Sequence, residues 1–497
     1  MKAASRRLVF FVTRPLHLAA FVLTACTMAT AVVATTKLYD PDVWWVAAAG
    51  REMFASARIP RENLFSFTEP HHAWLMHEWL LGPPYALGLE RLGPAFLVFC
   101  GLLVSSVGLF FILAGTVGRA RHAGAGLALA LVSVLFFGAR LLSARPTGVA
   151  LLFPLALCLV AFAPRLSAGG ALLSVAVELV WTNAHGSFPL GLVLLAVAWL
   201  DADADRRLRL GTLVLALLVT MVNPRGLSLY GFVFGYAFGD AGIYRMIHRQ
   251  IMEFRSVVGA WGNTVGPVDL VGLALLLALS GSAVVVAKHR VRASFCLLLL
   301  VGALAQVRHV ELAGLLGCQL MVPWADELWE RFRLVRTGEA QSPRVSYRWL
   351  IATPLALGVG LFLFSTARRP PGELLARGPA LLHGLRSVRE GSHLYVPFSE
   401  AGVAIWYGFP RGVRVFFDSR NDCYSPETWR SFLQLGERGI PKPVARQILD
   451  QSHTDAVLIP KGHPLSFLGD EPGWAQQFAE GSWSLYGRAK AHSIGTE

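Results

Sequence analysis

The chain has 497 residues, of which 54% are hydrophobic and only 15% are charged. Its mean hydropathy of +0.50 excludes an ordinary soluble protein and is typical of a helical protein that crosses a membrane many times. The formal net charge of +13 does not indicate nucleic-acid binding, because the basic residues lie in short clusters between apolar segments and form no nucleic-acid motif. Five of the six cysteines lie in apolar segments, so no disulfide framework or metal-binding spacing is predicted.

The N-terminal region combines a basic start with a long apolar segment. Arg6 and Arg7 precede an apolar run over residues 15–35, close to the roughly 20 residues that a membrane-spanning helix needs. Small residues near 29–34 would also suit a cleaved signal peptide, but the run is long for one and many apolar segments follow. We interpret residues 1–36 as a cytoplasmic tail and an uncleaved first transmembrane helix.

Ten further apolar segments predict a multi-pass region over residues 94–368. They cover residues 94–117, 123–142, 147–163, 171–181, 187–200, 208–222, 268–287, 293–307, 310–324 and 349–366. With the first helix, about eleven spans are expected, and those shorter than about 17 residues indicate tilted or buried helices.

The loops between these segments differ in chemistry from one side to the other. Every loop assigned to the cytoplasm is basic, as the positive-inside rule predicts. These loops contain Arg119, Arg121, Arg165, Arg206, Arg207, Arg209, Lys288, Arg290, Arg292, Arg331, Arg333, Arg336 and Arg344. The opposite loops carry other polar residues, among them Arg145, Asn183, His185, Arg225 and Arg308. Each of these is open to a plain capping or turn role, but their shared side predicts a binding site on the outer face.

The first outer loop, residues 37–93, carries the densest polar signal. It begins with Tyr39-Asp40-Pro41-Asp42-Val43-Trp44-Trp45 and includes His77-Glu78-Trp79. Aromatic and small residues over 43–54 predict a short helix along the membrane interface, and the tryptophan pair is explained either by an aromatic belt or by ligand contact. A second helix is predicted from near Ala73, which would turn His77 and Glu78 back toward the carboxylates.

Two further regions complete the predicted fold. Residues 227–266 mix charged and apolar residues, which predicts another outer loop with interfacial helices. Residues 369–497 predict a small extracytoplasmic α/β domain with strands at 393–397, 413–418 and 456–459 and helices at 426–435 and 443–451. The fold class is therefore an all-α polytopic membrane bundle with interfacial helices in the first outer loop and a small C-terminal α/β domain. In that domain, residues 418–422 follow a strand, where α/β sheets often bind ligands; a salt-bridged loop is the alternative.

Several motifs together carry a family resemblance. They are Asp40-Pro41-Asp42-Val43-Trp44-Trp45, Gly50-Arg51, Ile59-Pro60-Arg61, Phe65-Ser66-Phe67-Thr68, His77-Glu78-Trp79, Trp181-Thr182-Asn183-Ala184-His185-Gly186, Asn223-Pro224-Arg225-Gly226 and Asp418-Ser419-Arg420. With them the chain resembles bacterial multi-pass membrane proteins of the C-type glycosyltransferase (GT-C) superfamily, close to the dolichyl/polyprenyl-phosphate-sugar mannosyltransferase-like, family 39-like group. The resemblance implies an acidic catalytic residue in the first outer loop and a polyprenyl-phosphate sugar as donor. Val43 departs from the Asp-Glu pair of many members, and Val46 stands where close relatives carry His.

The chemistry of such a transfer assigns roles to the polar residues. A base must take the acceptor proton, and cations must stabilise the phosphate leaving group. Asp42 is the candidate base, although Asp also favours helix starts as a cap. Asp40 would tune Asp42 or bind a divalent metal with it. Substrate-binding candidates are Arg145, Arg225 and Arg308 as phosphate clamps, His77 and Glu78 toward the acceptor or a metal, and Asn183 and His185.

The sequence therefore predicts an integral membrane inverting glycosyltransferase, of the hexosyltransferase type, on the outer face of the bacterial cytoplasmic membrane. It would move a sugar from a polyprenyl-phosphate donor to an envelope glycan, lipid or protein acceptor. The expected partners are the lipid-linked donor and membrane lipids, and no nucleic acid. The candidate cofactor is a divalent metal ion bound by Asp40 and Asp42. Two alternatives remain open: a non-catalytic protein that binds or translocates lipid-linked glycans, and a scaffold whose terminal domain does the work.

Overall fold

The computed structural model describes residues 40–138, 144–240, 242–263, 265–336 and 378–489. The predicted first helix at 15–35, the predicted span at 349–366 and the basic residue Arg344 lie outside the described residues. The chain divides into two compact units. Of the described residues, one unit contains 97–138, 144–233, 248–263 and 265–336, and the other contains 40–96, 234–240, 242–247 and 378–489.

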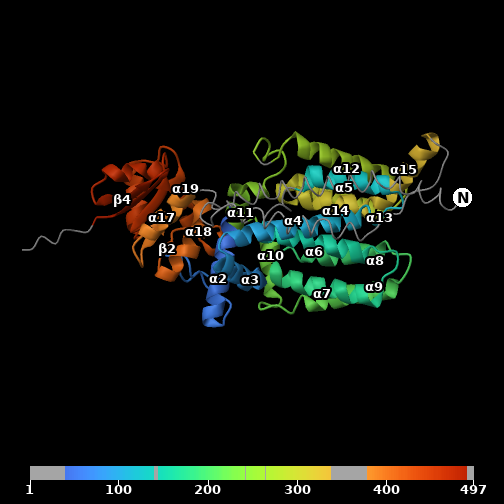
Figure 1. The fold of residues 1–497 in the computed structure, drawn as a ribbon, viewed down its shortest axis with the longest axis horizontal. Coiled ribbons are helices and arrows are strands. Elements are labelled where there is room, and N and C mark those ends of the chain that lie inside the picture. Colours follow the sequence, from blue (N-terminus) through green and yellow to red (C-terminus); the bar gives the residue numbers. More distant parts are fainter. Residues whose placement is uncertain (1–39, 139–143, 241, 264, 337–377, 490–497) are drawn as a thin grey trace, which may run out of the picture. The chain divides into compact units, whose positions relative to one another are not determined.

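The first unit is a bundle of helices (Figure 1). Its members are α4 (Ala95–Gly115), α5 (Ala123–Phe137), α6 (Pro146–Ala161), α7 (Ala168–Ala184), α8 (Pro189–Leu200), α9 (Arg206–Val219), α12 (Pro267–Val285), α13 (Arg290–Ala305), α14 (Val310–Leu320) and α15 (Val322–Arg336). Each apolar segment predicted between residues 94 and 307 forms a helix. Among the described residues, α4 and α12 are long and apolar enough to cross a membrane, by length and composition, and several shorter apolar helices accompany them.

The buried centre of this bundle is α14. It packs against α5, α6, α12 and α13, and almost all of its residues are buried. Gly314 permits a close approach to α5, since a Cβ atom there would lie 2.0 Å from the ring of Phe137. The predicted segment 310–324 is divided after Leu320, because Pro323 is placed in the first turn of α15, where proline favours a new helix start. Helices that are apolar all round belong in the interior.

The second unit contains the first outer loop and the C-terminal domain. Its helices are α2 (Pro41–Ser56), η1 (Trp79–Leu81), α3 (Gly82–Leu92), α17 (Gly378–Ser387), α18 (Phe398–Gly408), η5 (Phe409–Arg411), η6 (Asn421–Cys423), α19 (Pro426–Gly436), α20 (Lys442–Gln451) and η7 (Pro464–Asp470). Its strands are β1 (His393–Tyr395), β2 (Arg414–Val415), β3 (Ala456–Pro460), β4 (Trp474–Glu480) and β5 (Trp483–Arg488). The small C-terminal α/β domain is confirmed, with strands beginning near the predicted positions. Helices α10 (Ser228–Phe238) and α11 (Gly242–Gln250) and the 3₁₀ helix η3 (Met252–Phe254) form the helical structure expected over residues 227–266. Of these residues, 234–247 belong to the second unit and η3 belongs to the first.

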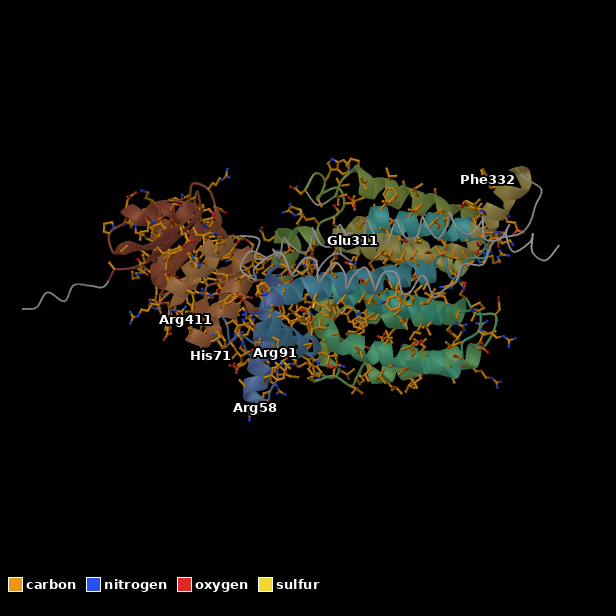
Figure 2. The ribbon with its side chains drawn as sticks, in the orientation of Figure 1. Arg58, His71, Arg91, Glu311, Phe332 and Arg411 are labelled. Carbon is orange, nitrogen blue, oxygen red and sulfur yellow. The ribbon has the colours of Figure 1, made fainter. Side chains whose placement is uncertain are left out.

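The sheet of this unit has the order β2-β1-β3-β5-β4. Strand β1 pairs in parallel with β2 and β3, whereas β5 runs antiparallel to both β3 and β4. The hairpin of β4 and β5 and the helix α18 were not predicted. Gly481 and Ser482 form the two-residue hairpin loop, with Gly481 at a φ of 57°, and Gly-Ser between alternating residues is a hairpin signal. Arg411, labelled in Figure 2, donates to the main-chain carbonyls of Leu385 and Val388 and so ties η5 to the end of α17.

The first outer loop is built into this sheet. The Val415 amide donates to the Phe65 carbonyl at 2.9 Å, and the Phe67 amide donates to the Val415 carbonyl at 3.2 Å. Residues 65–67 therefore extend the edge of the sheet beside β2. On the helical side, α2 packs against both α3 and α18. A Cβ atom at Gly402 of α18 would lie 2.1 Å from the Pro41 carbonyl oxygen, so glycine is required for this contact.

The two predicted helices of the first outer loop differ in outcome. The helix predicted over 43–54 is present as α2. The helix predicted from near Ala73 is wrong, because residues 62 and 73 pair in an antiparallel bridge and the Trp74 amide donates to the Arg61 carbonyl at 2.8 Å. Helix begins only with η1 and α3, where two prolines occupy the first turn, the position that tolerates proline.

Candidate functional site

Asp40 and Asp42 have different positions at the start of α2. Asp40 is the N-cap: its side-chain oxygen accepts a hydrogen bond from the Asp42 amide at 2.9 Å, and Pro41 follows in the first turn. Asp42 lies inside the first turn, where the helix dipole favours a negative charge. The capping role that the sequence allowed for Asp42 is therefore filled by Asp40.

Replacing this cap has an expected cost in stability. We expect Asp40→Ala to lower the free energy of unfolding by about 1 kcal/mol, because an amide at the start of α2 loses its acceptor. Asp40→Asn should remain within a few tenths of the wild-type value, since Asn caps helices about as well as Asp. Chemical denaturation of the full-length protein in detergent measures both. Equal stability of Asp40→Ala and the wild type would contradict the capping role.

The carboxylate of Asp42 is held by groups from two parts of the chain. Ser419 Oγ donates to Asp42 Oδ1 at 2.6 Å, and Trp45 Nε1 lies 3.1 Å from the same oxygen and 3.0 Å from Ser419 Oγ. Donors at these distances fix the rotation of the carboxylate. Ser419 is a residue that the sequence did not single out by itself, although it is the middle member of the Asp418-Ser419-Arg420 motif.

The neighbours of Ser419 form a buried ion pair. Arg420 Nη2 lies 2.6 Å from Asp418 Oδ2, and the two side chains are 1% and 0% exposed. The Arg420 Nε and main-chain amide both donate to Asp418 Oδ1 at 2.9 Å, and Tyr424 donates its hydroxyl to Asp418 Oδ2 at 2.6 Å. Of the two interpretations of residues 418–422, the structure matches a salt-bridged loop. Its position next to Asp42 makes it the support of the candidate site.

Aromatic and amide groups of the first outer loop complete this pair. The guanidinium of Arg420 lies 4.8 Å from the ring centroid of Phe65 and 4.6 Å from that of Trp74, and its Nη2 donates to Asn63 Oδ1 at 2.6 Å. Burial by itself would lower the pKa of Arg420, but the charge of Asp418 more than offsets this and the pKa is raised. Arg420 therefore stays charged.

Two further carboxylates lie in these two segments: Glu69 in the first outer loop and Asp422 in the loop of residues 418–422. Glu69 accepts from the Thr428 hydroxyl at 2.7 Å and the Ser425 amide at 3.2 Å. Burial would raise the pKa of Glu69, but these hydrogen bonds outweigh it and the pKa is lowered. Burial raises the pKa of Asp422 to about 6. Glu69 thus joins the first outer loop to the start of α19.

His77 and Glu78 lie in the turn that precedes η1. His77 Nε2 is 3.6 Å from Glu78 Oε1, and the two side chains are 23% and 8% exposed. A protonated His77 would therefore pair with its neighbour, which is held in the interior of the loop. With Asp40 and Asp42, these are the four predicted site residues that belong to the second unit.

In the first unit, Arg145 and Arg308 meet at the turn η3. Arg145 is the N-cap residue of α6, and its Nη1 lies 3.1 Å from Glu253 Oε1. The guanidinium of Arg308 lies 4.4 Å from the ring centroid of Phe254. Two predicted phosphate clamps from separate loops are thus brought to adjacent residues of one segment.

The other predicted residues of this unit form a second group. Asn183 at the end of α7 donates from Nδ2 to the Val222 carbonyl at 2.9 Å. Val222 directly precedes the turn that contains Arg225, and the Arg225 amide donates to Asn223 Oδ1 at 2.8 Å. His185 Nδ1 lies 2.8 Å from Ser187 Oγ. A hydrogen bond therefore links the Asn183 motif to the residue directly before the Asn223 motif.

The residues present do not support a metal site at the carboxylate pair. Among the described residues, no group of three or more His, Cys, Asp or Glu side chains is arranged to hold a metal ion. Asp40 serves a main-chain amide and Asp42 Oδ1 serves Ser419 and Trp45.

Comparisons with known proteins identify the fold. No protein-family model and no curated protein matches the chain. The oligosaccharyltransferase of Archaeoglobus fulgidus in its apo form aligns with a TM-score of 0.52 and 11% identity, covering 89% of this chain and 69% of that chain. The same values describe AglB from that organism in complex with an inhibitory peptide and a dolichol-phosphate. The fold of the chain is therefore similar to that of this archaeal protein.

At 11% identity this similarity shows the fold alone. The GT-C superfamily and the narrower family 39-like group that the motifs suggest therefore stay predictions. ArnT from Cupriavidus metallidurans in the apo state also aligns, with a TM-score of 0.49 and 13% identity over 97% of this chain and 98% of that chain.

Proposed function

We propose that the chain is an integral membrane glycosyltransferase of inverting type that takes a hexose from a polyprenyl-phosphate donor. Its active site would lie on the outer face of the bacterial cytoplasmic membrane. The acceptor would be an envelope glycan, lipid or protein. The apolar composition, the helical bundle and the fold shared with AglB support the class. The dolichol-phosphate in the AglB complex supports a polyprenyl-phosphate donor. The observation that carries the assignment is the fixed carboxylate of Asp42.

The proposed mechanism uses Asp42 as a general base. Asp42 would take the proton of the acceptor hydroxyl as that oxygen attacks the anomeric carbon on the face opposite the phosphate, which inverts the configuration. A positioned base contributes roughly 10²- to 10⁴-fold to such a step. Ser419 and Trp45 keep one carboxylate oxygen in place, so that the carboxylate does not have to reorganise during the reaction.

The polar residues of the first unit receive the leaving-group role in this proposal. The guanidinium groups of Arg145, Arg225 and Arg308 would neutralise the charge that develops on the lipid phosphate, because arginine matches phosphate oxygens with two parallel donors. Asn183 and His185 would contact the sugar or the phosphate, and His77 and Glu78 would orient the acceptor. Residues 37–93 are proposed as the catalytic loop, 94–368 as the membrane region and 369–497 as an outer domain that supports the loop.

A transfer assay tests the function directly. The purified protein in lipid vesicles is incubated with a radiolabelled polyprenyl-phosphate hexose and a crude envelope acceptor fraction. A new glycosidic bond of inverted configuration supports the proposal. Passage of the labelled lipid across the vesicle membrane without a new bond would instead support the non-catalytic alternative.

Ser419 is predicted to act as a positioning residue for Asp42. We expect Ser419→Ala to lower kcat about tenfold, since a hydrogen bond to a charged group contributes about 1.5–3 kcal/mol, while KM for the donor stays close to the wild-type value. Ser419→Thr keeps the hydroxyl and should recover most of the rate. Steady-state kinetics over a donor series measure the split between kcat and KM.

Ser466→Ala is the matched control for Ser419→Ala. Ser466 lies in η7, and its hydroxyl donates to the His463 carbonyl at 2.8 Å, so this variant should transfer sugar at the wild-type rate. A Ser419→Ala variant with unchanged kcat would show that the Asp42 contact has no part in the reaction.

A further inference from the structure

A pocket of about 560 Å³ lies in the first unit, formed by several of its interhelical turns. Residues of the turns after α4, α6 and α8 line it, together with residues from α9, α13 and α15. These turns are the loops whose basic residues predict the cytoplasmic side. The candidate residue Arg145 begins α6, whereas Phe162 in the pocket follows its end. A helix of 16 residues separates the two by about 24 Å, so this pocket is distinct from the proposed transfer site.

The charge of the pocket comes from four arginines and three aspartates, which leaves one positive charge in excess. They are Arg119, Arg121, Arg209, Arg292, Asp201, Asp203 and Asp326. Such a pocket could bind an anion, or its charged side chains could simply hold the turns together through ion pairs. The individual partners of these side chains distinguish the two possibilities.

Two of the aspartates are already occupied by fixed donors. Asp201 Oδ2 lies 2.5 Å from Arg292 Nε, so this pair is neutral as a unit. Asp326 accepts from the main-chain amides of Arg121 and His122, both at 2.8 Å, and so caps the start of α5. Neither carboxylate accepts a hydrogen bond from Arg119 or Arg209 among the contacts of the described residues. The negative charge of Asp201 still acts on both guanidinium groups, and that of Asp205, outside the pocket lining, acts on Arg209.

Arg119 and Arg209 are instead held by uncharged groups. Arg119 donates to the carbonyls of Cys158 and Phe162 at 3.4 and 2.6 Å. Arg209, which is 5% exposed, donates to the carbonyls of Ala161, Ala163 and Ala204. These contacts fix the guanidinium groups at the C-terminal end of α6 without neutralising their charge, although that helix end carries partial negative charge of its own. Each guanidinium has more N–H groups than these carbonyls use.

The remaining walls are apolar. Phe162, Ala198, Val322 and Pro323 line the same pocket. A ligand with a singly charged anionic group and a carbon skeleton would match this combination of fixed arginines, one excess positive charge and apolar walls. Phosphate oxygens are the anionic acceptors that the planar donor fork of arginine fits best, and basic pockets between transmembrane helices on the cytoplasmic side bind lipid head groups.

We propose that this pocket binds a phosphate group as a singly charged anion, with Arg119 and Arg209 as its donors. A phosphodiester of a membrane phospholipid and free inorganic phosphate share this chemistry. The site is additional to the proposed transfer reaction and does not depend on it.

Binding is tested with the full-length protein in an uncharged detergent, with inorganic phosphate and dihexanoyl phosphatidylglycerol as separate probes in isothermal titration calorimetry. We expect Arg119→Gln to weaken binding about tenfold or more, since hydrogen bonds to charged groups are the stronger class. Arg207→Gln is the matched control, because Arg207 is exposed near the same turn and does not line the pocket. It should bind like the wild type.

A variant that is expected to strengthen binding distinguishes a loss of the binding site from misfolding of the protein. Asp203 lines the pocket and is exposed, and Asp203→Asn removes one negative charge from the wall. We expect it to tighten binding roughly threefold or more, a gain that an unfolded protein cannot show. Binding of phosphatidylglycerol alone assigns the site to lipid, and binding of both probes with similar affinity assigns it to the free anion. No binding of either probe, or affinity unchanged in Arg119→Gln and Asp203→Asn, overturns the proposal.

Discussion

Asp42→Asn is expected to remove sugar transfer while the protein stays folded. Asparagine has nearly the shape of aspartate and still offers an oxygen to Ser419 and Trp45, which lie 2.6 and 3.1 Å from Asp42 Oδ1. It cannot accept the acceptor proton, so the rate should fall roughly 10²- to 10⁴-fold. The rate of transfer from a radiolabelled polyprenyl-phosphate hexose in vesicles measures the effect, and the unfolding curve of the same preparation establishes that the fold is kept.

A carboxylate in a similar local position provides the control for Asp42→Asn. Asp269 also lies in the first turn of its helix, α12, and accepts from the Gly266 amide at 2.8 Å. Asp269→Asn should transfer sugar at the wild-type rate. Wild-type activity of Asp42→Asn would show that the base is another residue, and equal losses in both variants would show that the assay reports on helix starts in general.

Arg420→Ala is expected to give the largest loss of stability. The variant leaves Asp418, which is 0% exposed, as a buried charge without its partner, and breaking a buried ion pair in this way costs about 3–5 kcal/mol. It also empties the space that the guanidinium occupies beside the rings of Phe65 and Trp74. Thermal and chemical unfolding of the full-length protein, followed by tryptophan fluorescence, measures the loss.

Two further variants serve as controls for Arg420→Ala. Arg430→Ala removes an exposed pair, since Arg430 and Glu427 are 61% and 71% exposed, and should cost at most about 1 kcal/mol. The double variant Asp418→Leu with Arg420→Met replaces both charges by apolar groups and should recover part of the stability; the recovery is partial because Tyr424 and Asn63 lose their hydrogen-bond partners. If the double variant is as unstable as Arg420→Ala, the loss comes from packing and the buried-charge explanation fails.

The sequence predicted the elements whose signals are local. Apolar length located the bundle helices, and the strands near residues 393, 414 and 456 followed from short β-rich runs between turn residues. The helix predicted near Ala73 failed because the structure of residues 62–74 is set by a bridge between two chain segments, which local helix propensity does not report. The β4 and β5 hairpin had a local signal in its Gly-Ser turn and could have been predicted.

In the candidate site too, residues with a local sequence signal were predictable and contacts between distant segments were not. Asp40 and Asp42 were chosen from their own segment, and the distinct capping position of Asp40 is readable from Pro41. The hydrogen bond between Ser419 and Asp42 joins residues that are 377 positions apart. Periodicity within a window of a dozen residues carries no information about such a partner. Asp42 and Ser419 each belong to one of the motifs that carry the family resemblance. Nothing in those motifs indicates that the two side chains are in contact.

The pairing of residues 65–67 with β2 has a consequence for biosynthesis. Ser66 bonds to the Phe416 carbonyl across a separation of 350 residues, so a ribosome adding about 5–20 residues per second needs roughly 20–70 s between the two. Throughout that interval the first outer loop lacks the edge strand and the serine that complete it. The proposed active centre is therefore assembled late, after the intervening bundle has been synthesised. Removing the C-terminal domain would leave Asp42 without Ser419, so a truncated chain cannot report separately on the loop and on the domain.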